Sequence, residues 1–233
     1  ALEVYAAALE AQRSAGDREA MIRTWVNIAI SHRARGEFAA ATEALERAVA
    51  EARALGHRAL EAQATLVLGT LYRLRGEPAR ALAVAEQAVT TFEAAGERAL
   101  AAEALVSRGH AQLALGAAGA ALGSYERALA TFTALSDRRQ MLIAREGLAA
   151  ARATLGEYAA ALVDYERVLA AYRAAGDRRW EAATLANTAS VLSRLGDHAG
   201  ARKLLDEALA IAVALGDRVG EASRLSTLGA VPY

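Results

Sequence analysis

The four histidines are the residues whose chemistry would be most diagnostic in this chain, because imidazole binds metals and transfers protons near neutral pH. They are His32, His57, His110 and His198. No two of them are four residues apart, which is the spacing that places two zinc ligands on one face of a helix, and His-Glu-x-x-His does not occur. The chain also has 0 Cys. We therefore expect no metal site and no thiolate chemistry.

Three closely spaced glycines are the second candidate for chemistry. Gly116, Gly119 and Gly123 could belong to a phosphate-binding loop. Such a loop needs a Gly-Lys-Ser/Thr sequence to hold the β- and γ-phosphates, and the only lysine in the chain is Lys203. The glycines are better interpreted as a loosened helical hairpin, and we expect no nucleotide cofactor.

The hydroxyls and carboxylates do not form a catalytic arrangement either. No serine stands in a Gly-x-Ser-x-Gly sequence. Glu126 and Glu166 each precede an arginine, Arg127 and Arg167, which is typical of a solvated helix surface. The sequence therefore predicts a chain that is not an enzyme and that binds no cofactor.

The composition indicates closely packed helices. The 233 residues are 55% apolar but only 5% aromatic, and 64 of them are alanine, the strongest helix former. Lys+Arg 27 and Asp+Glu 27 give a net charge of zero, so nothing attracts the chain generally to nucleic acid or to an acidic membrane. We expect a cytoplasmic protein without nucleic-acid or membrane partners.

A turn signal recurs every twenty residues along the whole chain. One series repeats every 40 residues and consists of Gly36-Glu37-Phe38, Gly76-Glu77-Pro78, Gly116-Ala117-Ala118, Gly156-Glu157-Tyr158 and Gly196-Asp197-His198. The second series falls midway and consists of Gly16-Asp17-Arg18, Gly56-His57-Arg58, Gly96-Glu97-Arg98, Ser136-Asp137-Arg138, Gly176-Asp177-Arg178 and Gly216-Asp217-Arg218. This regular spacing identifies a repeat protein.

The turns and the segments between them predict antiparallel helix pairs. A glycine supplies the left-handed residue that ends a helix, and an aspartate after it can accept the unpaired amide hydrogens of the next helix. Between turns, segments of roughly 16–18 residues carry apolar side chains at helical spacing. The segment with Ala41, Leu45, Ala48, Val49 and Ala52 is an example. About twelve helices result, and the short turns require neighbours to run antiparallel.

Small residues fill three positions of the repeat unit. One column reads Ala41, Ala81, Ala121, Ala161 and Ala201. A second reads Ala8, Ala48, Ala88, Ala128, Val168 and Ala208, and a third reads Ala29, Gly69, Gly109, Ala149, Ala189 and Gly229. The third and first columns are twelve residues apart, which places them on opposite sides of one hairpin. We expect the two helices of each pair to approach closely at these positions.

The pattern resembles the tetratricopeptide repeat. The best single match is Leu68-Gly69 with Tyr72, Gly76, Ala81 and Ala88, and Gly156-Glu157-Tyr158 with Ala161 and Tyr165 matches the second helix. The forty-residue length is similar to repeats in spindle-orientation adaptors and in bacterial signalling ATPases and transcription activators. The resemblance covers essentially the whole chain and implies an all-α, right-handed superhelical solenoid.

The register divides the chain into five complete repeats and two half repeats. The complete repeats are residues 17–56, 57–96, 97–136, 137–176 and 177–216, and the half repeats are 1–16 and 217–233. We interpret the chain as a single solenoid that is a fragment of a larger protein, since solenoid ends normally carry polar caps. The uncapped ends also raise the hypothesis of self-association.

The resemblance implies a binding site on the concave face, which the first helix of each pair lines. The predicted partner-binding residues are Arg23, Asn27, Arg33, Gln63, Arg73, His110, Asn187, Ser190 and Arg194. Asn27 and Asn187 match the asparagine that hydrogen-bonds the backbone of an extended ligand in peptide-binding relatives. The intervening repeats carry Val67, Ser107 and Gly147 at that position, so the series of amides is interrupted.

Three of these residues predict the charge of the partner. Arg23, Arg33 and Arg73 would place several guanidinium groups toward one end of the groove. Arginine pairs with carboxylates in a forked geometry, so we expect an acidic partner segment. The alternative is that these arginines pair with neighbouring glutamates of the chain.

We therefore predict a non-catalytic scaffold that binds a peptide or protein segment on its concave face. The alternative is a sensor or autoinhibitory arm of a larger bacterial signalling ATPase, transcription activator or caspase-like protease, with the catalytic domain outside this chain.

Overall fold

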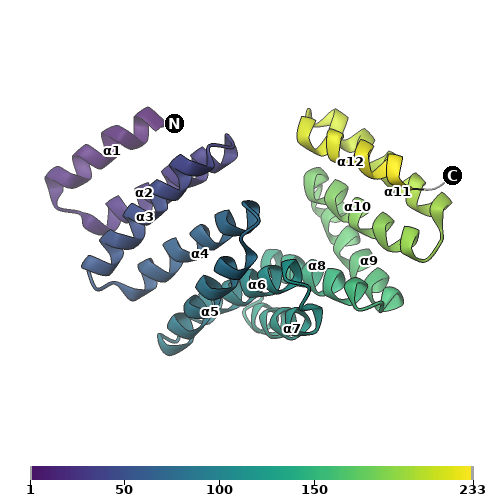
Figure 1. The fold of residues 1–233 in the computed structure, drawn as a ribbon, viewed down its shortest axis with the longest axis horizontal. Coiled ribbons are helices and arrows are strands. Elements are labelled where there is room, and N and C mark those ends of the chain that lie inside the picture. The colour runs from purple at the N-terminus through teal and green to yellow at the C-terminus, as the bar shows by residue number, and fades with distance from the viewer. Residues whose placement is uncertain (1, 232–233) are drawn as a thin grey trace. The chain divides into compact units, whose positions relative to one another are not determined.

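The computed structural model describes residues 2–231, which form twelve α-helices and no strand (Figure 1). The helices are α1 (Leu2–Ala15), α2 (Arg18–Ala34), α3 (Phe38–Ala54), α4 (Arg58–Leu74), α5 (Pro78–Ala94), α6 (Arg98–Ala114), α7 (Ala118–Ala134), α8 (Arg138–Thr154), α9 (Tyr158–Ala175), α10 (Arg178–Arg194), α11 (His198–Ala214) and α12 (Arg218–Ala230). Consecutive helices pack as antiparallel pairs within each compact part of the chain. The all-α repeat architecture predicted from the sequence is confirmed.

The chain divides into two compact units, and the division falls between Ser136 and Asp137. Unit 1 contains α1–α7 and unit 2 contains α8–α12. This boundary coincides with the predicted boundary between repeats 97–136 and 137–176. The membership of both units in one solenoid remains a prediction.

The predicted turn chemistry is confirmed at every turn. The ten glycines that lead the turn triplets have φ between 66° and 86°, and Ser136 takes their place with φ 57°. All five predicted aspartate caps are present, because Oδ1 of the residues at 17, 137, 177, 197 and 217 accepts a backbone N–H three residues later. The sequence did not predict that His57 acts in the same way, with its Nδ1 accepting from the Leu60 N–H at 3.3 Å.

Small side chains allow the helices to approach closely within each hairpin. The column of Ala41, Ala81, Ala121, Ala161 and Ala201 is at most 4% exposed. The facing column is buried from Ala29 to Ala189, whereas Gly229 of α12 is exposed. Large side chains fill the space beside this contact, and Phe92, Tyr125 and Phe132 are each 0% exposed. The core is therefore a seam of small residues flanked by aromatic rings.

Gly109→Ala is expected to lower the free energy of unfolding by about 1–3 kcal/mol, because overpacking a filled core forces neighbours to move. A Cβ atom on Gly109 would lie 2.6 Å from Cζ of Tyr125, whose ring is fully buried. Gly123→Ala is the matched control, since Gly123 is also helical but meets nothing within 4 Å. There alanine should stabilise the helix by about 0.5–1 kcal/mol. Urea denaturation of both variants measures the difference, and equal effects would contradict this packing.

Two acidic side chains are buried between helices of unit 2, one between α8 and α9 and the other between α9 and α10. Asp164 is 2% exposed and accepts hydrogen bonds from two arginines of α8, Arg145 at 2.9 Å and Arg152. A second buried acid, Glu181, accepts from Arg173 at 3.0 Å and from Arg178 at 2.6 Å. Each buried carboxylate is thus neutralised by two guanidinium groups.

No helix in residues 2–231 combines the length and apolar character that a bilayer crossing requires.

Candidate functional site

A groove of about 450 Å³ crosses the first helices of three successive pairs in unit 1. Its lining comes from α2 (Ile22, Arg23, Val26, Asn27), α4 (Leu60, Gln63, Leu66, Val67) and α6 (Leu100, Glu103). Three of the predicted binding residues, Arg23, Asn27 and Gln63, therefore lie in one groove. They come together because they occupy related positions on adjacent, parallel helices.

The groove has an apolar floor and a polar rim. Val26, Leu66 and Val67 are half-buried on the floor, whereas Asn27 and Gln63 are exposed on the rim. In the described part of the chain, the side-chain amide of Asn27 forms no hydrogen bond, and only its backbone carbonyl accepts one, from Ser31. The amide is thus available to a ligand both as a donor and as an acceptor.

Arg73 and His110 lie elsewhere, beside a cavity of about 30 Å³ between α4, α5 and α6. This volume admits water but no side chain of a ligand. The His110 ring contacts the ring of Tyr125 edge-on, with centroids 5.6 Å apart. Burial, with the nearby Arg73 charge, lowers the pKa of His110 to about 4. The imidazole is therefore neutral at neutral pH and presents no charge to a partner.

The three predicted arginines of unit 1 do not gather at one end of the groove. Arg23 and Arg33 are ten residues apart on α2, which is about 15 Å along the axis of a continuous helix. Arg33 and Arg73 stand at the same repeat position on neighbouring helices, and neither forms an ion pair within residues 2–231. Arg23 approaches Glu19 at 3.6 Å. Pairing with a neighbouring glutamate thus accounts for Arg23 alone.

The predicted residues of unit 2 are largely engaged in contacts within that unit. Asn187 of α10 donates its Nδ2–H to Oε1 of Glu146 on α8 at 2.9 Å. The Ser190 hydroxyl donates to the backbone oxygen of Ala186 at 3.0 Å, while Arg194 is exposed in the last turn of α10. Asn27 and Asn187 are equivalent by position, but only Asn27 has its amide available.

Glu146 itself was not among the predicted binding residues. It stands at a floor position that is apolar in the other four complete repeats, where the residues are Val26, Leu66, Val106 and Ala186. Burial raises its pKa from 4.5 to about 7, although the hydrogen bond from Asn187 lowers it in part. The sequence does mark Glu146, because it is the single charged residue at a position that is apolar in the other complete repeats.

In residues 2–231, no three His, Cys, Asp or Glu side chains are grouped so as to hold a metal ion.

Comparison with known proteins identifies the repeat. The sequence profile of the tetratricopeptide repeat matches residues 20–94 and 140–214, which is more than half of the chain. The chain belongs to the tetratricopeptide repeat family. No curated protein sequence matches this tetratricopeptide repeat chain.

Solved structures of low sequence identity share the fold. BtubC (BKLC) from P. vanneervenii is 21% identical, with a TM-score of 0.75 over 92% of this chain and 90% of that one. The Rap conjugation gene regulator of plasmid pLS20, in complex with a Phr peptide, is 12% identical, with a TM-score of 0.76 over 91% and 59%. A signal transduction ATPase with numerous domains (STAND) from Pyrococcus horikoshii, which has a tetratricopeptide repeat sensor, is 14% identical, with a TM-score of 0.65 over 89% and 35%.

Proposed function

We propose that this chain is a non-catalytic scaffold that binds an extended peptide or protein segment in the groove over α2, α4 and α6. The observation that carries the proposal is the combination of an apolar floor of Val26, Leu66 and Val67 with the available amide of Asn27 on the rim. Protein interaction is the general role that the fold supports, and the peptide-bound Rap structure is in keeping with it.

Each part of the groove suits a different part of a peptide. The Asn27 amide can donate to a peptide carbonyl and accept from a peptide N–H, so it recognises backbone irrespective of side chain. Gln63, on the first helix of the next pair, offers the same amide donor and acceptor. Apolar side chains of the ligand would lie on the valines and leucines between these amides. Backbone capture and floor contacts together favour an extended ligand with alternating apolar residues.

Acidic residues of the ligand would pair with Arg33 and Arg73. These guanidinium groups form no ion pair in the described residues, and they stand at equivalent positions of α2 and α4. We therefore infer a ligand whose acidic part lies toward the last turns of α2 and α4.

Peptides selected from a random library on the full chain should lose affinity when Asn27 is replaced. We expect Asn27→Ala to weaken binding about tenfold, which corresponds to roughly 1.4 kcal/mol for lost hydrogen bonds to the ligand. Isothermal titration calorimetry with the selected peptides measures the change. Raised salt should weaken the same peptides if Arg33 and Arg73 pair with their acidic residues.

Asn187→Ala is the matched control for this experiment. It removes the same amide at the equivalent repeat position of unit 2, where the amide already binds Glu146. Peptide affinity should therefore stay at the wild-type value. The proposal fails if Asn27→Ala leaves every selected peptide unchanged, or if both asparagine variants weaken binding equally.

The second candidate role is that of a sensor or autoinhibitory arm in a larger protein. The similarity to the STAND protein supports it, because 89% of this chain aligns with 35% of a chain that combines such a sensor with an ATPase. The ligand of the groove would then be a segment of the same polypeptide. The reading frame on either side of the present sequence distinguishes the two roles, since only an arm requires an attached catalytic domain.

A further inference from the structure

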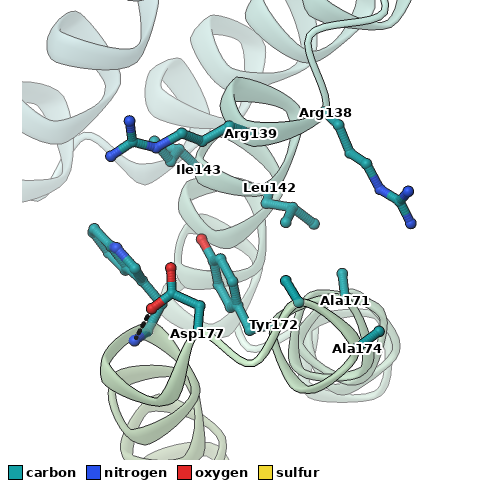
Figure 2. A pocket seen from close by; sticks show the side chains of 10 residues that line it. Arg138, Arg139, Leu142, Ile143, Ala171, Tyr172, Ala174 and Asp177 are labelled. Atoms are coloured by element: carbon teal, nitrogen blue, oxygen red, sulfur yellow. Dashed lines mark hydrogen bonds between the residues drawn. The ribbon is translucent and has the colours of Figure 1, made fainter.

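Unit 2 contains a pocket of about 370 Å³ that is separate from the groove of unit 1 (Figure 2). The pocket lies where the start of α8, the end of α9 and the start of α10 meet. Leu142 and Ile143 of α8, Ala171 and Tyr172 of α9 and Trp180 of α10 form its apolar walls. Its volume falls within the range of roughly 300–1,000 Å³ that is typical of small-ligand sites.

The pocket differs from the equivalent helix ends of the other repeats in carrying Trp180, where those repeats have Leu60, Leu100, Gln140 and Gly220. Where the first complete repeat meets the second, the equivalent helix ends carry Ile22, Ala52 and Leu60, which pack together as a closed core. Where the fourth complete repeat meets the fifth, Tyr172 stands in the position of Ala52, which is Phe92 and Phe132 in the repeats between, and Trp180 stands in the position of Leu60. The two rings stack with centroids 6.0 Å apart and an interplanar angle of 21°. Trp180 nevertheless remains 37% exposed.

Two arginines flank the mouth of the pocket without a partner. Arg138 and Arg139 are exposed, and neither forms an ion pair within residues 2–231. Figure 2 shows that they leave α8 in different directions, with Leu142 between them. Asp177 is the acidic group among the lining residues, and its Oδ1 accepts the Trp180 backbone N–H at 3.4 Å. The charges at the mouth therefore favour an anion on the α8 side, away from Asp177.

The Tyr172 hydroxyl adds a polar group on that side. It points toward α8 in Figure 2, and no hydrogen bond to it occurs in the described residues. Burial, followed by the charges of Glu146 and Asp177, raises the pKa of Tyr172 to about 12, although Arg139 lowers it in part. The hydroxyl thus keeps its proton and can donate.

We propose that this pocket binds a small aromatic carboxylic acid, with its ring between Leu142 and the stacked Tyr172 and Trp180, and its carboxylate on Arg139. A guanidinium group binds a carboxylate through two parallel hydrogen bonds, and aromatic walls favour a flat apolar ring. The acid can be a free molecule or the C-terminal residue of a peptide, since both present the same ring and carboxylate. The site belongs to unit 2 alone and does not depend on the proposed peptide groove of unit 1.

Titration with three small probes tests the proposal on the full chain. The probes are 3-phenylpropionate, N-acetyl-phenylalanine and the amide of N-acetyl-phenylalanine. Fluorescence of Trp180, isolated by Trp25→Phe, should change saturably with both acids, and the amide should bind at least about tenfold more weakly. Ligand-observed NMR on the unaltered chain gives a second readout if Trp25→Phe destabilises unit 1. Tighter binding of N-acetyl-phenylalanine would identify a peptide terminus, and tighter binding of 3-phenylpropionate would identify a free acid.

Paired variants locate the site. Arg139→Gln should weaken both acids about tenfold, whereas Arg179→Gln, at the equivalent position of the next repeat and outside the pocket, should not. Ala171→Leu should abolish binding by filling the pocket, whereas Ala170→Leu, at the exposed neighbouring position, should leave it intact. Equal affinities for acid and amide, or an unchanged affinity in Arg139→Gln or Ala171→Leu, would overturn the proposal.

Discussion

Replacing Asp164 by alanine is expected to lower the free energy of unfolding by about 3–5 kcal/mol. The Asp164 carboxylate is 2% exposed and binds the guanidinium groups of Arg145 and Arg152. Its removal leaves Arg145 without a counterion and Arg152 with only Glu157, 4.0 Å away, although the two arginine side chains are only 22% and 27% exposed. Uncompensated charge in a low-dielectric interior costs far more than the small loss of side-chain volume. Urea denaturation of the full chain, followed by circular dichroism, measures the loss.

The next repeat provides the control for this prediction. At the three equivalent positions it carries Leu185, Leu192 and Leu204, which belong to or pack against its apolar core. The triple variant Arg145→Leu, Arg152→Leu, Asp164→Leu should therefore recover most of the stability that Asp164→Ala loses. A triple variant as unstable as the single one would show that the ion pairs contribute net stability, contrary to this explanation.

The stability of unit 2 is expected to fall as the pH rises from about 4.5 to about 7, because of Glu146. Burial raises the pKa of its carboxyl from 4.5 to about 7 in the folded chain. The folded state consequently holds the proton more tightly than the unfolded state. The cost of ionising Glu146 is absent below the unfolded pKa and complete above the folded pKa. It reaches at most about 3 kcal/mol.

Glu146→Gln should remove this pH dependence and make the chain more stable than the wild type above pH 7. Glutamine keeps an acceptor for the Asn187 amide, which is 2.9 Å away, but carries no charge. The other titratable groups that act with Glu146 are Tyr165 and Tyr172 of α9, and both keep their protons in this range because burial raises the pKa of each. Unfolding free energies measured at pH 5, 6, 7 and 8 test the prediction. Parallel pH profiles for wild type and variant would contradict it.

Asn27 and Asn187 occupy equivalent positions in the repeat, but their side-chain amides differ in whether they are available to a ligand. The register of the repeat places Asn27 and Asn187 at equivalent positions, and the structure agrees. Glu146 of the preceding repeat engages the amide of Asn187, whereas the side-chain amide of Asn27 forms no hydrogen bond within residues 2–231. Binding through unit 2 at this position would therefore require the Glu146 contact to be exchanged for a ligand contact.

The helices, the turns and the close contacts of the hairpins follow from the sequence alone. Glycine at a fixed position ends each helix because it takes positive φ without steric cost, and aspartate after it caps the next helix. These are local interactions between residues a few positions apart. The close contacts at Ala41 and its equivalents were predicted from the repeat register, because the register determines which face of each helix meets its partner.

The sequence also placed Arg23, Asn27 and Gln63 in what proved to be one groove, because equivalent positions on parallel helices lie side by side. The sequence-based prediction grouped Arg23 with Arg33 at one end of the groove, although the two residues are ten positions apart on α2. That separation follows from helix geometry alone, and a residue-by-residue count along α2 would have found it.

Which polar groups are engaged, buried or available depends on the tertiary packing of different helices against one another. The Asp164 cluster, the Glu146–Asn187 contact and the pocket at Tyr172 and Trp180 each join side chains from two or three helices. Their properties depend on distances of a few ångströms and on the loss of water around a charge. Both arise from the way particular helices pack, which the average pattern of the repeat does not show.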